Sequence, residues 1–201
     1  MLTSKSSRPT PERLLDAAET LMRTIGLANT TTKAIAREAG CSEAALYKHY
    51  ANKEELFVRV LMERTPNAGP LMAELTAEHP QRPVPEGLTA IARHAAHFYA
   101  DAMPLAASLF AEPALLTRHR EGVRQIGTGP HVVRDALARH LRRELDAGRL
   151  RPDADPEAAA ALLLGACFQR AFFLHFSGED VVTPVEEFAP AVARTLWAAI
   201  G

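Results

Sequence analysis

The sequence predicts an all-α protein with about nine or ten helices. Strand signals are nearly absent, because the chain contains no Asn-Gly hairpin turn and no long alternation of polar and apolar residues. Apolar residues recur instead at helical spacing, and Pro and Gly mark the breaks between segments. With 201 residues, of which 47% are hydrophobic, the chain suits one domain or a small domain joined to a larger one.

The first helix is predicted to run from Thr10 to Gly26. Thr10 is the expected cap, and Pro11 suits the first helical position, where a missing N–H costs nothing. Gly26 favours termination. A second, short helix is predicted to begin with Thr31 or Thr32 as its cap.

The second and third helices are predicted to surround a glycine turn. The second helix ends at Ala39, Gly40 permits a left-handed turn, and Ser42 caps a third helix that reaches about Tyr50. Two helices of this length around such a turn have the dimensions of a helix-turn-helix. The second helix of that motif lies in the DNA major groove, with its first residues at base edges and flanking groups at phosphates.

The third helix carries an unusual set of exposed side chains for its length. Small inward contacts come from Ala45 and Leu46, whereas the outer face presents Ser42, Glu43, Ala44, Tyr47, Lys48 and His49. A fourth helix is predicted to begin at Asn52, with Glu55 completing a cap of the N-x-x-E kind. It is expected to continue past Leu71, with a bend near Pro66 and Pro70.

The remaining two thirds of the chain also read as helical. The segment Glu78–Gly87 is rich in Pro and Gly and predicts a loop. Further helices are expected at about Glu86–Ala102, Leu105–Glu112, Ala114–Gln125, His131–Ala147, Pro156–Phe176 and Pro184–Ala199.

The stretch TTKAIAREAGCSEAALYKHYANKEELF, residues 31–57, resembles the DNA-binding signature of TetR/AcrR-type transcriptional regulators. The resemblance implies an N-terminal three-helix DNA-binding head, assigned to residues 1–55, and a larger helical ligand-binding and dimerisation domain, residues 56–201. It implies a homodimeric repressor that binds a near-palindromic operator in double-stranded DNA and is released by a small, largely apolar inducer, without a cofactor. An activator or architectural protein that uses the same DNA surface without an inducer remains the alternative.

The resemblance also assigns residues to the DNA. Thr31 and Thr32 match phosphate-binding positions, Lys33 matches a position that often reaches DNA, and the start of the third helix faces bases. The positions that match the family, together with Lys48 on the outer face, are Thr31, Thr32, Lys33, Ser42, Glu43, Ala44, Ala45, Tyr47, Lys48, His49 and Lys53. Glu43 departs from the pattern, because a carboxylate repels phosphate unless it accepts from a cytosine amino group. Cys41 stands where an aliphatic residue is usual.

Each of these residues has a structural alternative. The Tyr47 ring could cover the core, Lys48 could be solvated, and His49 could cap the helix C-terminus. The N-terminal arm SKSSR, residues 4–8, could enter a minor groove or be disordered.

The segment Ala158–Phe176 is apolar on nearly every side, so it must be covered on all of them. Its length suits a membrane span, but Gln169 and Arg170 near its middle and the acidic residues around it argue against one. We expect one face to pack within its own domain and another to meet a second subunit. The residues assigned to a four-helix dimer interface are Leu162, Gly165, Ala166, Phe188, Val192 and Leu196.

Aromatic and sulfur side chains of the larger domain suffice to line an apolar cavity. The candidate ligand-binding residues are Phe98, Tyr99, Met103, Phe110, Phe168, Gln169, Arg170 and Phe172, with Trp197 beside them. Most of these rings could equally be ordinary core. A buried Arg170 would need a partner, which could be Glu186, Glu187 or a ligand carboxylate.

Other functional classes have little support. His94 and His97 are three residues apart, but no carboxylate or Cys completes a metal site. Cys41 and Cys167 could form a redox switch, yet nothing near them in the sequence favours a thiolate. No nucleophile–base set or phosphate loop indicates an enzyme. Two Cys and no signal peptide predict a cytoplasmic protein without a disulfide framework.

Overall fold

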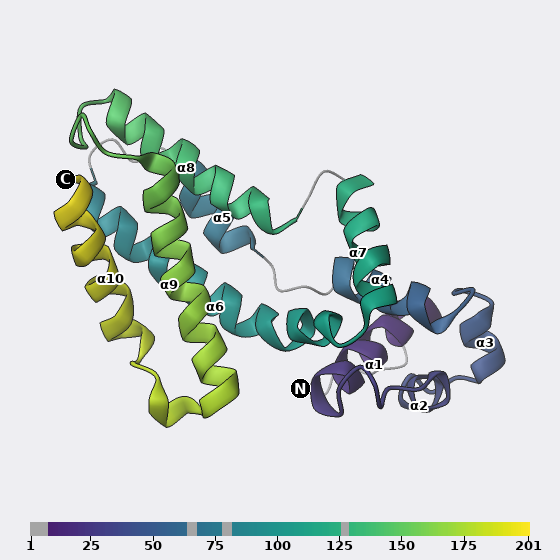
Figure 1. Ribbon diagram of the computed structural model, residues 1–201. Helices are drawn as coiled ribbons and strands as arrows, with labels where there is room; N and C mark the ends of the chain where they lie inside the picture. The colour runs from purple at the N-terminus through teal and green to yellow at the C-terminus, as the bar shows by residue number, and fades with distance from the viewer. Residues whose placement is uncertain (1–7, 64–67, 78–81, 126–128) are drawn as a thin grey trace. The chain divides into compact units, whose positions relative to one another are not determined.

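The structure is a computed structural model that describes residues 8–63, 68–77, 82–125 and 129–201. Over these residues it contains ten α-helices, one short 3-10 helix and no strand, so the predicted all-α fold is confirmed (Figure 1). The elements are α1 (Thr10–Thr24), α2 (Thr32–Glu38), α3 (Glu43–Tyr47), α4 (Lys53–Glu63), α5 (Gly69–Thr76), α6 (Val84–Phe110), α7 (Pro113–Gln125), α8 (Pro130–Asp146), α9 (Pro156–Ser177), η1 (Glu179–Val181) and α10 (Val185–Ile200).

Packing divides the chain into two compact units. The first comprises residues 1–65 and 104–127, and the second comprises residues 66–103 and 128–201. The core of the first unit joins side chains of α1 to α4 with Leu105 and Leu109 from the end of α6 and Leu115 from α7. A domain boundary after residue 55 therefore falls within α4, whereas in the structure all of α4 packs with the head.

The second unit is built around α9, which packs against α8 and α10, while α5 packs against α8 (Figure 1). Ala160, Leu163, Cys167 and Ala171 of α9 are fully buried and follow one another at intervals of three or four residues. This spacing places them on one face of the helix, which faces the core of the unit. Among the described residues α9 is also the one helix long and apolar enough to cross a membrane, a property that the core helices of soluble proteins share.

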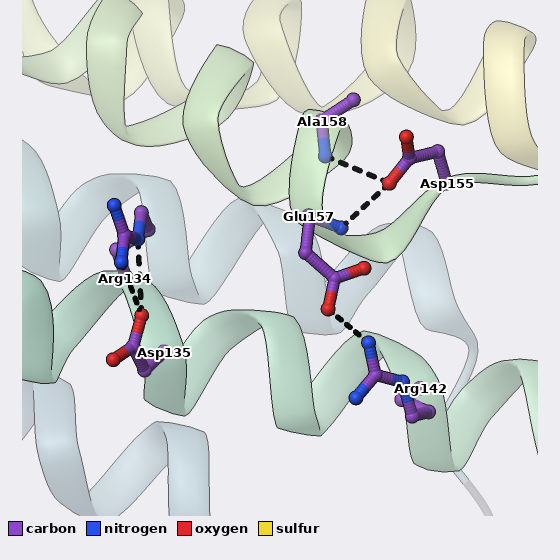
Figure 2. A network of polar contacts seen from close by, with 6 residues as sticks. All are labelled: Arg134, Asp135, Arg142, Asp155, Glu157 and Ala158. Carbon is purple, nitrogen blue, oxygen red and sulfur yellow. Dashed lines mark hydrogen bonds and ion pairs between the residues drawn. The ribbon is translucent and has the colours of Figure 1, made fainter.

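The beginning of α9 is fixed by side chains close to it. Asp155 Oδ1 accepts hydrogen bonds from the backbone N–H groups of Glu157 and Ala158, both at 3.0 Å (Figure 2). Pro156 occupies the first turn, where its missing N–H is not needed. Glu157 in turn pairs with Arg142 of α8, so that an ion pair joins the two helices (Figure 2). The predicted start at Asp155-Pro156 is confirmed.

Other helix boundaries differ from the sequence prediction. Thr10 is the first helical residue of α1, and Pro9 is the N-cap without a side-chain cap bond, so the assignment of Thr10 as the cap was wrong. Gly26 directly follows the C-cap with φ +78°, which is the left-handed conformation expected of a helix terminator. A separate helix, α5, begins after the N-cap Ala68, and Pro70 lies in its first turn. Pro66 lies outside the described residues.

The largest difference concerns α6, a single helix where the sequence predicts two with a break at Pro104. Pro104 cannot donate to the carbonyl of Ala100, its partner four residues earlier in a regular helix. In the structure His175 Nε2 of α9 lies 2.7 Å from that carbonyl oxygen. A donor from a distant helix therefore replaces the missing N–H. The helix also begins at Val84, inside the predicted loop Glu78–Gly87, of which residues 78–81 lie outside the described part.

We expect His175→Phe to lower the free energy of unfolding by about 1 kcal/mol, because the carbonyl of Ala100 then loses its donor. In a Pro104→Ala background the regular backbone donor is restored, and the same change at His175 should cost clearly less. Urea unfolding of the four proteins gives the coupling between the two positions. Equal costs of His175→Phe in both backgrounds would show that this hydrogen bond does not compensate for Pro104.

Candidate nucleic-acid interface

The turn between α2 and α3 is held by its own backbone. Ala39 is the C-cap of α2, and Gly40 follows with φ +67°. The Cys41 N–H donates to the carbonyl of Ala36 at 2.9 Å, and the Gly40 N–H donates to that of Arg37 at 3.1 Å. These two bonds constitute a Schellman motif, which requires a left-handed residue at the position of Gly40. The Cys41 side chain packs against the core of the unit, in the place where such a motif commonly has an apolar contact.

Both short helices have the predicted caps. Thr31 Oγ1 accepts from the backbone N–H of Ala34 at 3.2 Å, and Ser42 Oγ accepts from that of Ala45 at 3.1 Å. Each bond satisfies one N–H that a helix start leaves without a partner in the backbone. Local sequence therefore fixes where α2 and α3 begin.

The start of α4 is capped in both directions, as the sequence predicts. The backbone N–H of Glu55 donates to Asn52 Oδ1 at 2.8 Å, and Glu55 Oε2 accepts from the backbone N–H of Ala51 at 2.7 Å. Lys53, assigned to DNA by resemblance, places its ammonium group 5.1 Å from the centre of the buried Phe57 ring. Its charge thus has a cation–π partner within the protein.

The recognition helix α3 separates an inner from an outer face. Leu46 is fully buried, and Tyr50 beyond the helix end is buried as well, whereas Tyr47 is 50% exposed. The helix ends at Tyr47, three residues before the predicted end. Tyr47 therefore keeps about half of its surface accessible to a binding partner. The residues exposed to solvent from Ser42 to His49 are Ser42, Ala44, Tyr47, Lys48 and His49, and Glu43 and Ala45 are half-buried.

Polar groups at the start of α2 lie close to the start of α3. Thr31 and Lys33 are exposed, and Thr32 is half-buried. The Thr32 hydroxyl donates to Glu43 Oε1 on α3, a contact between residues eleven positions apart. This bond could not be predicted from the sequence, since it depends on how the two helices cross. Of the N-terminal arm only Arg8 is described, and it pairs with Asp16 of α1 at 2.7 Å.

The structure brings together only part of the predicted ligand-binding set. The Tyr99 ring meets those of Phe98 and Phe168 edge to face, with centroids 5.2 and 5.7 Å apart. Burial, and to a lesser degree the nearby Cys167, raises the pKa of the Tyr99 hydroxyl to about 12, so this hydroxyl remains neutral. Phe110 belongs to the other unit and is 74% exposed.

The remaining members of that set have other surroundings. Arg170 donates from Nε to the carbonyl of Thr183 at 2.9 Å, and its guanidinium lies 5.6 Å from the centre of the Phe188 ring. It therefore ties α9 to the segment that leads into α10, instead of pairing with Glu186 or Glu187. The buried Met103 lies on α6, and the exposed Gln169 and Phe172 lie on α9.

The residues assigned to the dimer interface fall into two groups. Leu162 is 66% exposed, and a Cβ added at Gly165 would meet nothing within 4 Å. Phe188 and Val192 are instead half-buried against the core of their own unit, and Leu196 is buried within it. Ala166 is half-buried. The interface expected from α10 residues is thus largely taken up by intramolecular packing.

An exposed apolar stripe runs along α9, and only part of it was predicted from the sequence. Its members recur every three or four residues and comprise Ala158, Ala161, Leu162, Gly165, Phe168, Phe172, Phe173 and Phe176. Phe172 and Phe176 stack with ring centroids 5.1 Å apart. The repeat is visible in the sequence, but because the helix is apolar all round, spacing alone did not distinguish this face from the buried one.

The other candidate chemistries find no assembled site. Within the described residues no group of three or more His, Cys, Asp or Glu side chains could hold a metal ion. Cys41 and Cys167 are free thiols in different units. Burial raises the pKa of the Cys167 thiol to about 12, which keeps the thiol protonated, and its Sγ lies 3.5 Å from the carbonyl of Ala92.

Both parts of the chain match families of known proteins. Residues 14–60 match the family described as "Bacterial regulatory proteins, tetR family", and residues 86–197 match "AefR-like transcriptional repressor, C-terminal domain". The chain is 39% identical over 67 residues to the HTH-type transcriptional regulator YvkB of Bacillus subtilis, which covers 33% of the chain and 35% of that protein. It is 30% identical over 82 residues to the regulator AcrR of Shigella flexneri, over 41% of the chain and 38% of that protein. The similarity thus spans only a little more than a third of each curated relative.

The fold is similar to that of solved structures over nearly the whole length of the chain. The crystal structure of a TetR-family regulator from Mesorhizobium loti matches with a TM-score of 0.76 and 20% identity, covering 99% of each chain. The second family match alone extends over more than half of the chain. The helix-turn-helix that precedes it in the sequence has its caps, its glycine turn and an exposed recognition face. The chain belongs to the TetR family of bacterial transcriptional regulators.

Proposed function

We propose that the protein is a repressor that binds a near-palindromic operator through α3 and its surroundings. The observation that carries this proposal is the exposed surface at α3, where Tyr47 at the end of the helix and Lys48 and His49 directly after it are exposed. A helix presented in this way fits the major groove, where its first residues reach base edges and flanking groups reach phosphates. We infer repression, and not activation, because the family that matches the C-terminal part is described as a transcriptional repressor.

Exposed cations around α3 supply the non-specific part of this binding. Lys33, Arg37 and Lys48 are exposed, and Thr31 keeps a hydroxyl proton that it can donate to a phosphate, since its oxygen acts as acceptor in the helix cap. The net charge of the whole chain is only −1, so the attraction comes from these few side chains and not from a basic protein as a whole.

The protein is proposed to act as a homodimer joined through the exposed stripe of α9. Eight apolar residues along α9 are exposed to solvent in the single chain, and contiguous apolar surface of this kind marks sites of interaction. Small residues at Ala161 and Gly165 allow a second helix to approach closely. A two-fold dimer has two recognition helices, and paired helices of this kind bind successive major grooves, about 34–36 Å apart or a multiple of that distance. Such a regulator would work in the cytoplasm.

The inducer is proposed to be small and largely apolar, and to contact the cluster of Phe98, Tyr99 and Phe168. These rings offer apolar surface, and the neutral Tyr99 hydroxyl offers one polar contact. Such a ligand would release the operator only if it binds better to a state that does not bind DNA. Screening lipophilic compounds for a raised melting temperature, and the hits for release of bound DNA, tests this part of the proposal.

The DNA-binding surface is tested with Tyr47→Ala and Lys48→Ala. We expect each variant to bind a duplex selected by the wild-type protein at least about a hundredfold more weakly, because each loses a hydrogen bond to a charged phosphate in both heads, at about 1.5–3 kcal/mol for each bond. Lys48→Ala should also lower the slope of log affinity against log salt by about 1 for each lost phosphate contact. Fluorescence anisotropy with labelled duplexes measures both quantities.

Arg93→Ala, an exposed position on α6 of the second unit, is the matched control, and it should leave affinity and slope unchanged. Wild-type affinity of the Tyr47→Ala, Lys48→Ala double variant would remove α3 from the interface.

A further inference from the structure

Glu43 is the residue of the recognition helix that DNA binding leaves unexplained. It is the first residue of α3, and Thr32 is the first residue of α2. Neither residue caps its own helix, because Thr31 and Ser42 do so. The Thr32 hydroxyl donates to Glu43 Oε1, and both side chains are half-buried in this contact.

We propose that Glu43 is a positioning residue of the helix-turn-helix, which acts through Thr32 and does not read a base. This inference rests on the proposed DNA-binding function. The Schellman turn fixes the backbone between the helices at one end of α2, and the bond between Thr32 and Glu43 fixes the opposite end of α2 against the start of α3. With both connections in place, α3 is held in one orientation relative to α2.

The charge of Glu43 is consistent with this role. A carboxylate in the groove would repel phosphates, and its one favourable base contact is with a cytosine amino group. The bond to Thr32 engages one carboxylate oxygen with α2, while the neighbouring Ser42 and Ala44 are exposed. A hydrogen bond to an ionised acceptor is stronger than one between neutral groups, so this connection is a firm one.

The same bond divides the roles of the two threonines. A hydroxyl has one proton to donate, and that of Thr32 is directed at Glu43. Thr31 uses only its oxygen in capping, so its proton remains for a phosphate. We therefore assign the phosphate contact at the start of α2 to Thr31 and the connection to α3 to Thr32. Base contacts at the start of α3 then fall to the Ser42 hydroxyl and to the Ala44 methyl group, which suits a thymine methyl.

The test begins with selection of preferred sequences from random duplexes by the wild-type protein, Thr32→Val, Thr32→Ser, Glu43→Ala and Glu43→Gln. Affinity for the selected duplex and for an unrelated duplex is then measured at one salt concentration. Loss of a hydrogen bond to a charged group should reduce the ratio of specific to non-specific affinity about tenfold in Thr32→Val and in Glu43→Ala. The double variant Thr32→Val, Glu43→Ala should lose no more than either single variant.

The conservative variants separate positioning from base reading. Thr32→Ser keeps the donor and Glu43→Gln keeps an acceptor oxygen, so both should retain the wild-type consensus and nearly the wild-type affinity ratio. A change of the preferred base at one position in Glu43→Gln, with none in Thr32→Val, would show that Glu43 reads DNA and would overturn the proposal. Additive losses in the double variant would overturn it as well.

Failure of the wild-type protein to enrich any sequence would refute the DNA-binding function, and the positioning role with it. Enrichment by the wild-type protein combined with either adverse result above would refute the positioning role alone. Melting temperatures of all variants identify any protein whose low affinity reflects unfolding. If Thr32→Val or Glu43→Ala unfolds in this way, the proposal is tested with Thr32→Ser and Glu43→Gln instead, because these two variants preserve the hydrogen bond.

Discussion

Leu162→Glu is expected to convert the protein from a dimer to a monomer and to abolish tight operator binding. Leu162 is 66% exposed in the first half of the α9 stripe, where a second copy is proposed to cover it. In a two-fold dimer the substitution occurs twice in one interface. Each of the two unpaired carboxylates buried there costs about 3–5 kcal/mol, so that together they weaken the dimer by more than about ten-thousandfold. Sedimentation velocity at micromolar protein measures the change in mass.

Loss of the dimer should weaken operator binding far more than loss of a single DNA contact does. Two linked heads bind two half-sites with an effective concentration that raises avidity about 10²–10⁴-fold above that of one head. Arg93→Glu introduces the same carboxylate at an exposed position outside the stripe and should leave mass and affinity unchanged. A wild-type protein that sediments as a monomer, or a Leu162→Glu protein that remains a dimer, would show that α9 does not form the interface.

Gly165→Leu separates association from folding. A Cβ added at this position meets nothing within 4 Å in the single chain, and glycine within a helix costs about 0.5–1 kcal/mol relative to alanine. The monomer should therefore tolerate this change, while the added bulk prevents close approach of a second α9. A lower dimer affinity without a lower stability of the monomer is the expected pair of results.

The parts of the fold that depend on local chemistry could be predicted from the sequence. Thr31, Ser42 and Asn52 each form the predicted cap bond, because a cap requires only a suitable oxygen two or three residues before a free N–H. The glycine turn followed from the same reasoning. Here the residues that determine the structure are neighbours in the chain.

The parts that depend on distant residues could not be predicted. Pro104 has the properties of a helix breaker, and α6 continues through it with His175, 75 residues from Ala100, at the carbonyl that Pro104 leaves free. The exposed face of α9 could not be distinguished from its buried face, since both are apolar. In the candidate site the outer face of α3 followed from periodicity, but the hydrogen bond of Glu43 depends on the arrangement of two helices in space.

Phe57→Ala is expected to destabilise the DNA-binding unit by about 3–5 kcal/mol, because it removes a large buried ring and leaves a cavity. Phe57 is 1% exposed and lies in the core that α1 to α4 share with the end of α6 and α7. Its ring also holds the Lys53 ammonium at 5.1 Å, a contact that the substitution removes. Urea unfolding followed by circular dichroism measures the loss, and the transition of the first unit should move to lower denaturant concentration.

Phe110→Ala provides the matched control for this substitution, because the same atoms are removed from a ring of the same unit that is 74% exposed. A substitution at an exposed position of this kind should change the free energy of unfolding by less than about 0.5 kcal/mol. Equal effects of the two substitutions would show that Phe57 does not form part of a packed core.

If the difference is as large as expected, Phe57→Ala should also lose operator binding near its unfolding transition while remaining a dimer, because α9 belongs to the other unit. A helix-turn-helix with a five-residue recognition helix has little stability of its own, so α3 holds its position only through the core beneath it.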